Sequence, residues 1–202
     1  MFVICSDMEG VFTPEIWIAV SKKTGIEKLS LTTRDISDYD QLMKMRIGIL
    51  EANGLKLKDI QDVIAGMEPL AGAREFLDWM RRKAPVIVVS DTFSQFADPL
   101  MEKLGRPALF CNTLVVDGND RVTGYTLRMK DGKRHTAAAL KGLNFKVIGI
   151  GDSYNDVTML KEADSGILFR PPENVIREFP QFPVTTDYET AKAEIEKAMR
   201  KA

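Results

Sequence analysis

The chain has 202 residues, of which 45% are hydrophobic and 28% charged, and its net charge at neutral pH is -1. These values are typical of a globular protein with one elaborated domain or two small ones. A nearly neutral chain gives no electrostatic reason to expect nucleic acid or an anionic membrane as a partner. No apolar run approaches a membrane span and Asp7 comes too early for a secretory leader, so we expect a cytoplasmic protein.

The reactive side chains limit the chemistry further. His135 is the only histidine, which argues against a catalytic Ser-His-Asp set and a histidine-rich metal site. Cys5 and Cys111 lie far apart in apolar stretches, and we expect them to be buried free thiols. The chemistry is therefore expected to depend on carboxylates, hydroxyls, lysines and a hard cation.

The first element is an apolar run over residues 2–5, which predicts a short buried strand. The run is followed by Asp7 and Glu9, with Gly10 directly behind them. Because ligands bind at the carboxyl ends of strands in a parallel α/β sheet, both carboxylates are expected to face one cleft. One of them can act there as nucleophile or metal ligand and the other as general acid and base.

Helical patterns fill the next part of the chain, up to about Met67. The expected helices cover residues 14–25, 38–53 and 58–64. This block contains no convincing strand and is too long for a loop. We therefore predict a helical cap, residues 14–67, inserted into a core domain of residues 1–13 and 68–202.

The rest of the chain alternates helices and apolar strands, which predicts an α/β fold with a Rossmann-like parallel sheet and helices on both faces. The expected strands are 86–89, 146–150 and 166–169, and the expected helices are 73–82, about 93–104, 137–140 and 187–199. Two alternating runs flank residues 117–120, an Asp-Gly-Asn-Asp sequence that predicts a small β-hairpin.

Three of the apolar runs end in a polar cluster. The clusters are Asp7 with Glu9, Ser90 with Asp91, and Asp152 with Asn155 and Asp156. In a parallel sheet these clusters lie at the same edge. Mg²⁺ prefers oxygen ligands, and Asp7 and Asp152 can supply two of them. A metal ion beside a carboxylate nucleophile, a hydroxyl and a lysine is an assembly suited to phosphoryl transfer.

Four motifs in this order resemble those of the haloacid dehalogenase superfamily of phosphohydrolases. They are Asp7-x-Glu9-Gly10-Val11, Ser90-Asp91, a lysine before the strand at 146–150, and Gly151-Asp152-x-x-Asn155-Asp156. The helical insert resembles the phosphoserine phosphatase branch of this superfamily. Five stretches resemble the members of that branch that also transfer the phosphoryl group to homoserine: residues 14–19, 32–36, 90–93, 151–156 and 172–183.

The resemblance implies Mg²⁺-dependent phosphoryl transfer from phosphoserine to water and to homoserine, through an aspartyl-phosphate. Asp7 would be the nucleophile and Glu9 the acid and base, while Ser90 and the Asp91 N–H would hold the phosphoryl oxygens. In the cap, Glu15 and Arg46 resemble the pair that holds the amino acid. Their charges suit an ammonium and a carboxylate respectively.

For the metal, the resemblance implies Asp7, the Glu9 carbonyl and Asp152 as ligands, with Asp156 supporting them. Asn155 would contact phosphate or substrate. The phosphate-binding lysine is one of three candidates, Lys130, Lys133 and Lys141. We favour Lys133 because it follows a glycine and opens a helix.

Glu9 departs from the pattern, since most phosphatases of the superfamily carry aspartate at this position. One extra methylene moves the carboxyl group by more than an ångström, which can shift the balance between acceptors. A phosphoserine phosphatase without transferase activity and a related small phosphomonoester hydrolase therefore remain alternatives. A flavodoxin-like phospho-acceptor domain is disfavoured because such domains are shorter and lack the helical insert.

Overall fold

The computed structural model describes residues 1–32, 35–36 and 38–201. Within them, seven strands form one sheet in the order β4-β3-β2-β1-β5-β6-β7, parallel throughout except for the antiparallel pair β3 and β4. The strands are β1 (Phe2–Ser6), β2 (Val86–Phe93), β3 (Ala108–Val116), β4 (Val122–Thr126), β5 (Lys146–Gly151), β6 (Ser165–Phe169) and β7 (Val184–Thr185). The predicted α/β class is confirmed.

Strand β1 lies at the centre of the sheet, where Cys5 pairs with Ile87 on one side and with Gly149 on the other. Successive β1 side chains point to opposite faces, so Val3 joins one hydrophobic cluster and Ile4 the other. A strand covered on both faces must be apolar throughout, which is why this run reads as continuously hydrophobic. The central position places the end of β1 between its neighbours.

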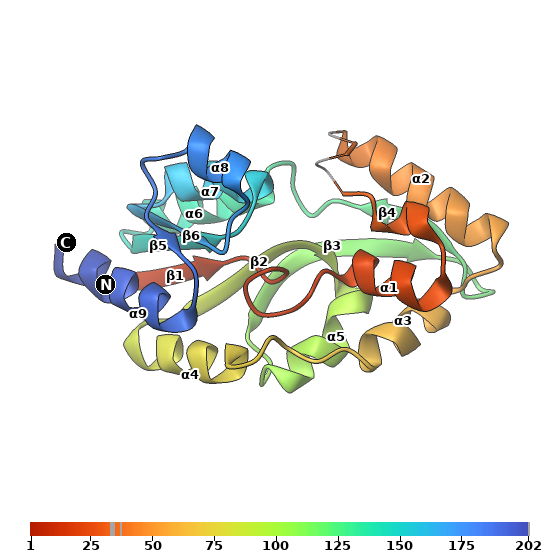
Figure 1. Ribbon diagram of the computed structural model, residues 1–202, viewed down its shortest axis with the longest axis horizontal. Coiled ribbons are helices and arrows are strands. Elements are labelled where there is room, and N and C mark those ends of the chain that lie inside the picture. Colours follow the sequence, from red (N-terminus) through yellow and green to blue (C-terminus); the bar gives the residue numbers. More distant parts are fainter. Residues whose placement is uncertain (33–34, 37, 202) are drawn as a thin grey trace.

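Helices cover both faces of the sheet, with α6, α7 and α8 on one side and α4, α5 and α9 on the other (Figure 1). Their bounds are α4 (Ala73–Lys83), α5 (Ser94–Lys103), α6 (Gly132–Gly142), α7 (Val157–Glu162), α8 (Glu173–Glu178) and α9 (Tyr188–Lys201), with the short 3-10 helix η2 at Tyr154–Asp156. Within the described ranges, no helix is long and apolar enough to cross a membrane.

Between β1 and α4 the described chain forms helices and no named strand. These helices are α1 (Ile16–Thr24), η1 (Glu27–Ser30), α2 (Tyr39–Ala52) and α3 (Leu57–Ala65). Helix α2 packs on β4 and α3 packs on α5 (Figure 1). The hairpin turn also caps α3, because the Asp120 carbonyl accepts from Leu57 N–H and its carboxylate accepts from Lys58 N–H, both at 2.9 Å.

Several elements extend beyond their sequence-based bounds. Strand β2 continues through Phe93 with an irregular register after Val89, and α6 begins at Gly132 rather than 137. Strand β3 starts at Ala108 and pairs with β2 before it pairs with β4, so the hairpin continues the main sheet. Cys111 on β3 is half-buried, so the expectation that it is buried is wrong.

Candidate active site

The nucleophile candidate Asp7 lies just beyond β1 and is 4% exposed. Its backbone N–H donates to the Ile150 carbonyl at 2.9 Å, and its Oδ1 accepts from the Met8 N–H at 2.7 Å. These two hydrogen bonds hold the Asp7 carboxylate in one orientation beside the neighbouring strand, β5.

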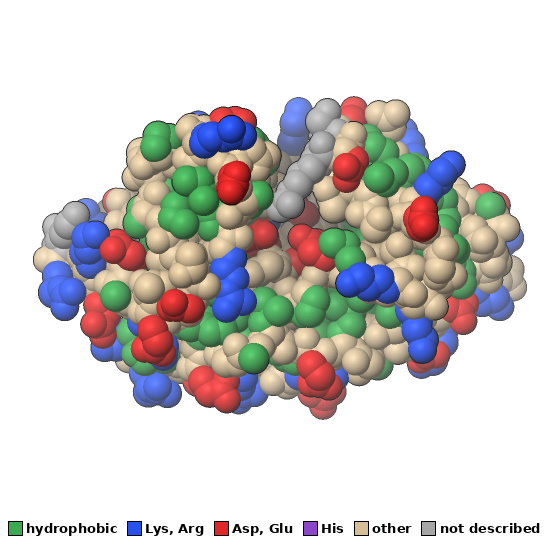
Figure 2. All heavy atoms as spheres, in the orientation of Figure 1, with side chains coloured by type: hydrophobic (Ala, Val, Ile, Leu, Met, Phe, Trp, Pro, Cys, Tyr) green, Lys and Arg blue, Asp and Glu red, His purple; other side chains and the backbone are tan. Residues whose placement is uncertain are grey.

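The surface of the molecule has a notch between the lobe of α6–α8 and the lobe of α2. Acidic side chains lie at the floor of this notch (Figure 2).

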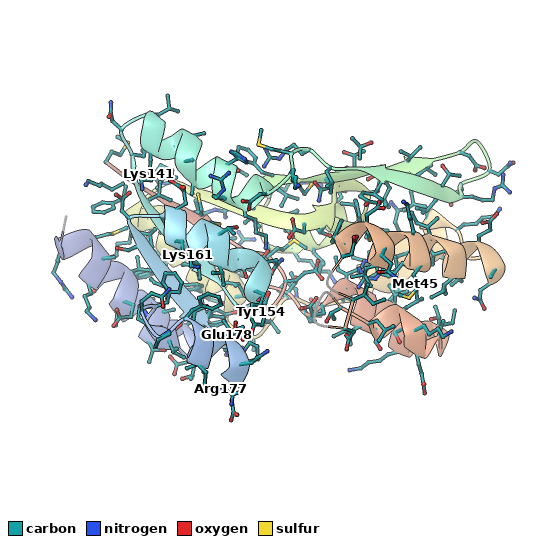
Figure 3. The ribbon with its side chains drawn as sticks, turned by 90° about the horizontal axis from the view of Figure 1, so that it is seen from above. Met45, Lys141, Tyr154, Lys161, Arg177 and Glu178 are labelled. Carbon is teal, nitrogen blue, oxygen red and sulfur yellow. The ribbon has the colours of Figure 1, made fainter. Side chains whose placement is uncertain are left out.

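Of the three candidate lysines, the structure brings Lys133 to Asp7. The Lys133 side chain is 3% exposed, and its ammonium lies 2.9 Å from Asp7 Oδ2 and 2.7 Å from Asp156 Oδ1. Burial opposes its charge, but the two carboxylates outweigh burial and raise the pKa of Lys133. Lys130 is exposed, and Lys141 lies at the far end of α6, where it donates to the Glu162 carbonyl (Figure 3).

Three buried carboxylates, those of Asp7, Asp152 and Asp156, offer oxygen atoms within 4.8 Å of one another. Asp156 is already satisfied, because Oδ1 accepts from Lys133 and Oδ2 accepts from the Asp152 and Ser153 N–H groups. Burial, together with the Asp156 charge, raises the pKa of Asp152 to about 7. One ammonium cannot balance three buried carboxylates, so the donor set and its charge fit a divalent cation.

Gly10 keeps space open beside this cluster. Its φ is +77°, and a Cβ atom at this position would lie 2.4 Å from Asp152 Oδ2. Only glycine combines the left-handed conformation with that close approach. The requirement for glycine directly after Glu9 is therefore steric, and the sequence alone did not reveal it.

The end of β2 brings the next predicted residues to the same edge. Ser90 is 6% exposed, and its Oγ accepts from the Thr92 N–H at 3.2 Å. Asp91 Oδ2 accepts from Asn155 Nδ2 at 2.9 Å and lies 3.8 Å from the Lys133 ammonium. Asp7 after β1, Asp91 in the last part of β2 and Asp156 after β5 thus meet around Lys133, as the sequence predicts.

Glu9 points from the same loop toward helix α1. Its Oε2 accepts from the Ile16 N–H, the first amide of α1, at 2.8 Å. Burial, followed by the nearby charge of Glu15, raises the pKa of Glu9 to about 8. A carboxyl group of this kind retains a proton near neutral pH and can deliver it to a leaving group.

Arg46 on α2 is 6% exposed and has no carboxylate in salt-bridge contact among the described residues. Its Nη2 donates to the Leu31 carbonyl at 2.8 Å, while Nε is buried without a hydrogen-bond partner. Burial lowers the pKa of Arg46 to about 10, although the charges of Glu9 and Glu15 oppose this shift. A buried donor without a partner is costly, and an anionic ligand would satisfy it.

Two residues at this edge were not predicted from the sequence. Tyr39, the first residue of α2, donates from its hydroxyl to the Asp91 carbonyl at 3.1 Å. Asn112 on β3 donates to the same carbonyl at 3.1 Å and is 6% exposed. Neither lies in a motif or at a predicted strand end, so only the packing of α2 and β3 against β2 reveals them.

A family profile described as haloacid dehalogenase-like hydrolase matches residues 6–161, so the chain belongs to this family. The phosphoserine phosphatase ThrH of Pseudomonas aeruginosa is 58% identical over 198 residues, covering 98% of this chain and 97% of that protein. A phosphoserine phosphatase of Pseudomonas syringae pv. tomato is 56% identical over 196 residues, covering 97% of this chain and 83% of that protein.

Solved structures agree with the fold. A phosphoserine phosphatase in its apo form has a TM-score of 0.72 at 22% identity, covering 88% of this chain and 90% of that one. A phospho-aspartyl intermediate analogue of phosphoserine phosphatase has a TM-score of 0.73 at 20% identity, covering 91% of each chain.

Proposed function

We propose that this protein transfers the phosphoryl group of O-phosphoserine to Asp7, and from Asp7 to water or to homoserine. The observation that carries this proposal is the contact between the buried Asp7 carboxylate and Lys133 at the common edge of β1, β2 and β5. The two Pseudomonas relatives, both named phosphoserine phosphatase and more than half identical, support the same substrate.

The reaction has two balanced steps. In the first, an oxygen of Asp7 forms a bond to phosphorus while the bond from phosphorus to the serine oxygen breaks, and Glu9 gives its proton to that oxygen. In the second, Glu9 takes the proton from water or from the homoserine hydroxyl. The freed oxygen bonds to phosphorus, and the bond from phosphorus to Asp7 breaks.

The residues around Asp7 hold the phosphoryl group and its charge. The Lys133 ammonium, the Ser90 hydroxyl and the Asp91 N–H would donate to phosphoryl oxygens, and Asn155 stands beside them. In phosphoryl transfer, positioning and charge neutralisation supply most of the rate enhancement.

Mg²⁺ fits the acidic cluster, whose charge exceeds that of Lys133. Asp7, Asp152 and the Glu9 carbonyl would hold the ion, and Asp156 would orient its neighbours through Lys133 and the 152–153 amides. When bound, the ion supplies positive charge to the phosphoryl oxygens.

Arg46 and Glu15 are proposed to bind the amino acid part of the substrate. The unpartnered Nε of Arg46 suits the α-carboxylate, and Glu15 suits the α-ammonium. Residues 14–67 would thus form a cap that selects the substrate, while residues 1–13 and 68–202 carry the chemistry. We propose a cytoplasmic location for this activity.

Homoserine carries the same ammonium and carboxylate as serine, with one more methylene before its hydroxyl. Water is abundant, so an alcohol competes only if the protein binds and orients it. Orientation can supply an effective molarity on the order of 10⁵ M or more, which is enough to compete with water.

The test is phosphorus NMR of the purified protein with phosphoserine and Mg²⁺, with and without homoserine. We expect phosphohomoserine alongside free phosphate in the first case and only phosphate in the second. Free phosphate alone at saturating homoserine would show a phosphoserine phosphatase without transferase activity. Unchanged phosphoserine in both tubes would contradict the proposed substrate.

A further inference from the structure

The backbone carbonyl of Asp91 accepts two hydrogen bonds from elements that lie far apart in the sequence. One comes from the Tyr39 hydroxyl at the start of α2, and the other comes from the Asn112 side chain on β3, both at 3.1 Å. The Asn112 amide is itself held, because its Oδ1 accepts from the Arg128 N–H at 3.0 Å. A helix of the inserted segment and a strand of the core therefore meet at one peptide group.

The N–H end of the same peptide group orients the Ser90 hydroxyl. The Thr92 N–H, which shares a peptide plane with the Asp91 carbonyl, donates to Ser90 Oγ at 3.2 Å. Because the Ser90 oxygen accepts this bond, its own proton points elsewhere, and it donates to no acceptor within the described part of the chain. Hydrogen bonds in such a chain polarise one another, so donors on the carbonyl strengthen the N–H at the far end.

We propose that Tyr39 is a positioning residue: its hydroxyl fixes the Asp91–Thr92 peptide so that Ser90 is aimed to donate to a bound phosphoryl group. This inference rests on the phosphate-binding role of Ser90 in the proposed function. The Tyr39 hydrogen bond would couple the packing of α2 against β2 to the binding of phosphate. Such coupling is reciprocal, so packing of α2 favours phosphate binding and phosphate binding favours packing of α2.

The surroundings of Tyr39 provide a clean way to remove only its hydroxyl. The Tyr39 ring packs edge-on against Tyr125, with 5.8 Å between centroids and an interplanar angle of 85°. A phenylalanine at 39 keeps this packing. Tyr125 is the matched control, because its hydroxyl donates to Asp40 Oδ1 at 2.7 Å rather than to the Asp91 carbonyl.

The experiment measures the binding of inorganic phosphate by calorimetry, in the presence of Mg²⁺, to the wild type, Tyr39→Phe, Tyr125→Phe, Ser90→Ala and the Tyr39→Phe/Ser90→Ala double variant. Tyr39→Phe should weaken phosphate binding by about 3- to 10-fold, as expected for one hydrogen bond. Tyr125→Phe should stay within about twofold of the wild type. In the Ser90→Ala background, Tyr39→Phe should have no further effect.

The double variant separates positioning from simple packing of the helix. A loss that persists undiminished without Ser90, or a Tyr39→Phe affinity equal to that of the wild type, overturns the proposal. A wild type that binds no phosphate overturns it as well. Phosphoserine turnover is assayed separately. Phosphate binding without turnover would contradict the proposed substrate, while the comparison of the single and double variants would still decide the role of Tyr39.

Discussion

The guanidinium of Arg46 lies over the indole ring of Trp17, with 4.6 Å between Cζ and the ring centroid. Trp17 on α1 is held in turn by an edge-on contact with Phe96 on α5, at 5.5 Å between centroids. A planar cation on an aromatic face is fixed in orientation as well as in position. The stack therefore presents the free edge of Arg46 in a defined direction.

This stack predicts that lysine cannot replace Arg46. Both Arg46→Ala and Arg46→Lys should raise KM for phosphoserine by about 10- to 100-fold, because the hydrogen bonds lost involve charged groups. Lys44→Ala is the control on the same helix, since Lys44 is exposed and pairs with Asp40. Steady-state kinetics measure the effect. A near-normal KM in Arg46→Lys would contradict the requirement for a planar guanidinium at this position.

Asp7→Asn should abolish turnover of phosphoserine while the protein stays folded. The loss should reach several orders of magnitude, because no other side chain can form the covalent intermediate. Circular dichroism and initial rates check the two halves of this prediction. Asp62→Asn, an exposed carboxylate on α3, should keep full activity. Substantial activity in a clean Asp7→Asn preparation would exclude the aspartyl-phosphate route.

The two glycines Gly10 and Gly54 allow backbone strain to be separated from steric conflict. Both have positive φ, but a Cβ at Gly54 meets nothing within 4 Å, whereas one at Gly10 collides with Asp152. Alanine at either position should cost about 1 kcal/mol of unfolding free energy from backbone strain. Only Gly10→Ala should also lower activity sharply, as measured by denaturant titration and steady-state assay. Equal activities in both variants would contradict the steric conflict between a Cβ atom at position 10 and Asp152.

Chelation should stop turnover without unfolding the protein, because the hydrophobic core does not depend on an ion. Added Mg²⁺ should raise the melting temperature by neutralising the acidic cluster, and should do so less in Asp152→Asn. Asp98→Asn, an exposed carboxylate paired with Arg106, should respond like the wild type. Ca²⁺ should support turnover poorly, because it takes more ligands at longer distances. An identical increase in melting temperature with Mg²⁺ in the wild type, Asp152→Asn and Asp98→Asn would indicate that the ion binds elsewhere.

The sequence predicted the sheet and the convergence of its polar clusters because both follow from local patterns. A continuous apolar run ending in Asp7 identifies a central strand and its functional end without any knowledge of its neighbours. The sequence favoured Lys133 over Lys130 and Lys141 but did not decide between the three lysines. The decision depends on the direction in which α6 leaves its first turn, and this direction is set by packing on α7 and β5.

Other features depend on contacts that no local pattern records. Tyr39 and Asn112 look like ordinary helix and strand residues until α2 and β3 meet beside Asp91. The two-residue strand β7 and the short helix α8 are too brief to show a period of hydrophobicity. Trp17 lies between Arg46 on α2 and Phe96 on α5, and this placement depends on how three helices pack rather than on a local pattern.

The central place of β1 has a consequence for how the protein is made. Strand β1 leaves the ribosome well before its partners β2 and β5, which lie much later in the sequence. Lys133 and Asp152 lie far beyond Asp7 in the sequence, so a nascent chain carries Asp7 before the groups proposed to act with it have been synthesised. Long-range parallel pairing is slow to form. The proposed catalytic centre is thus complete only after residues that are far apart in the sequence have docked against β1.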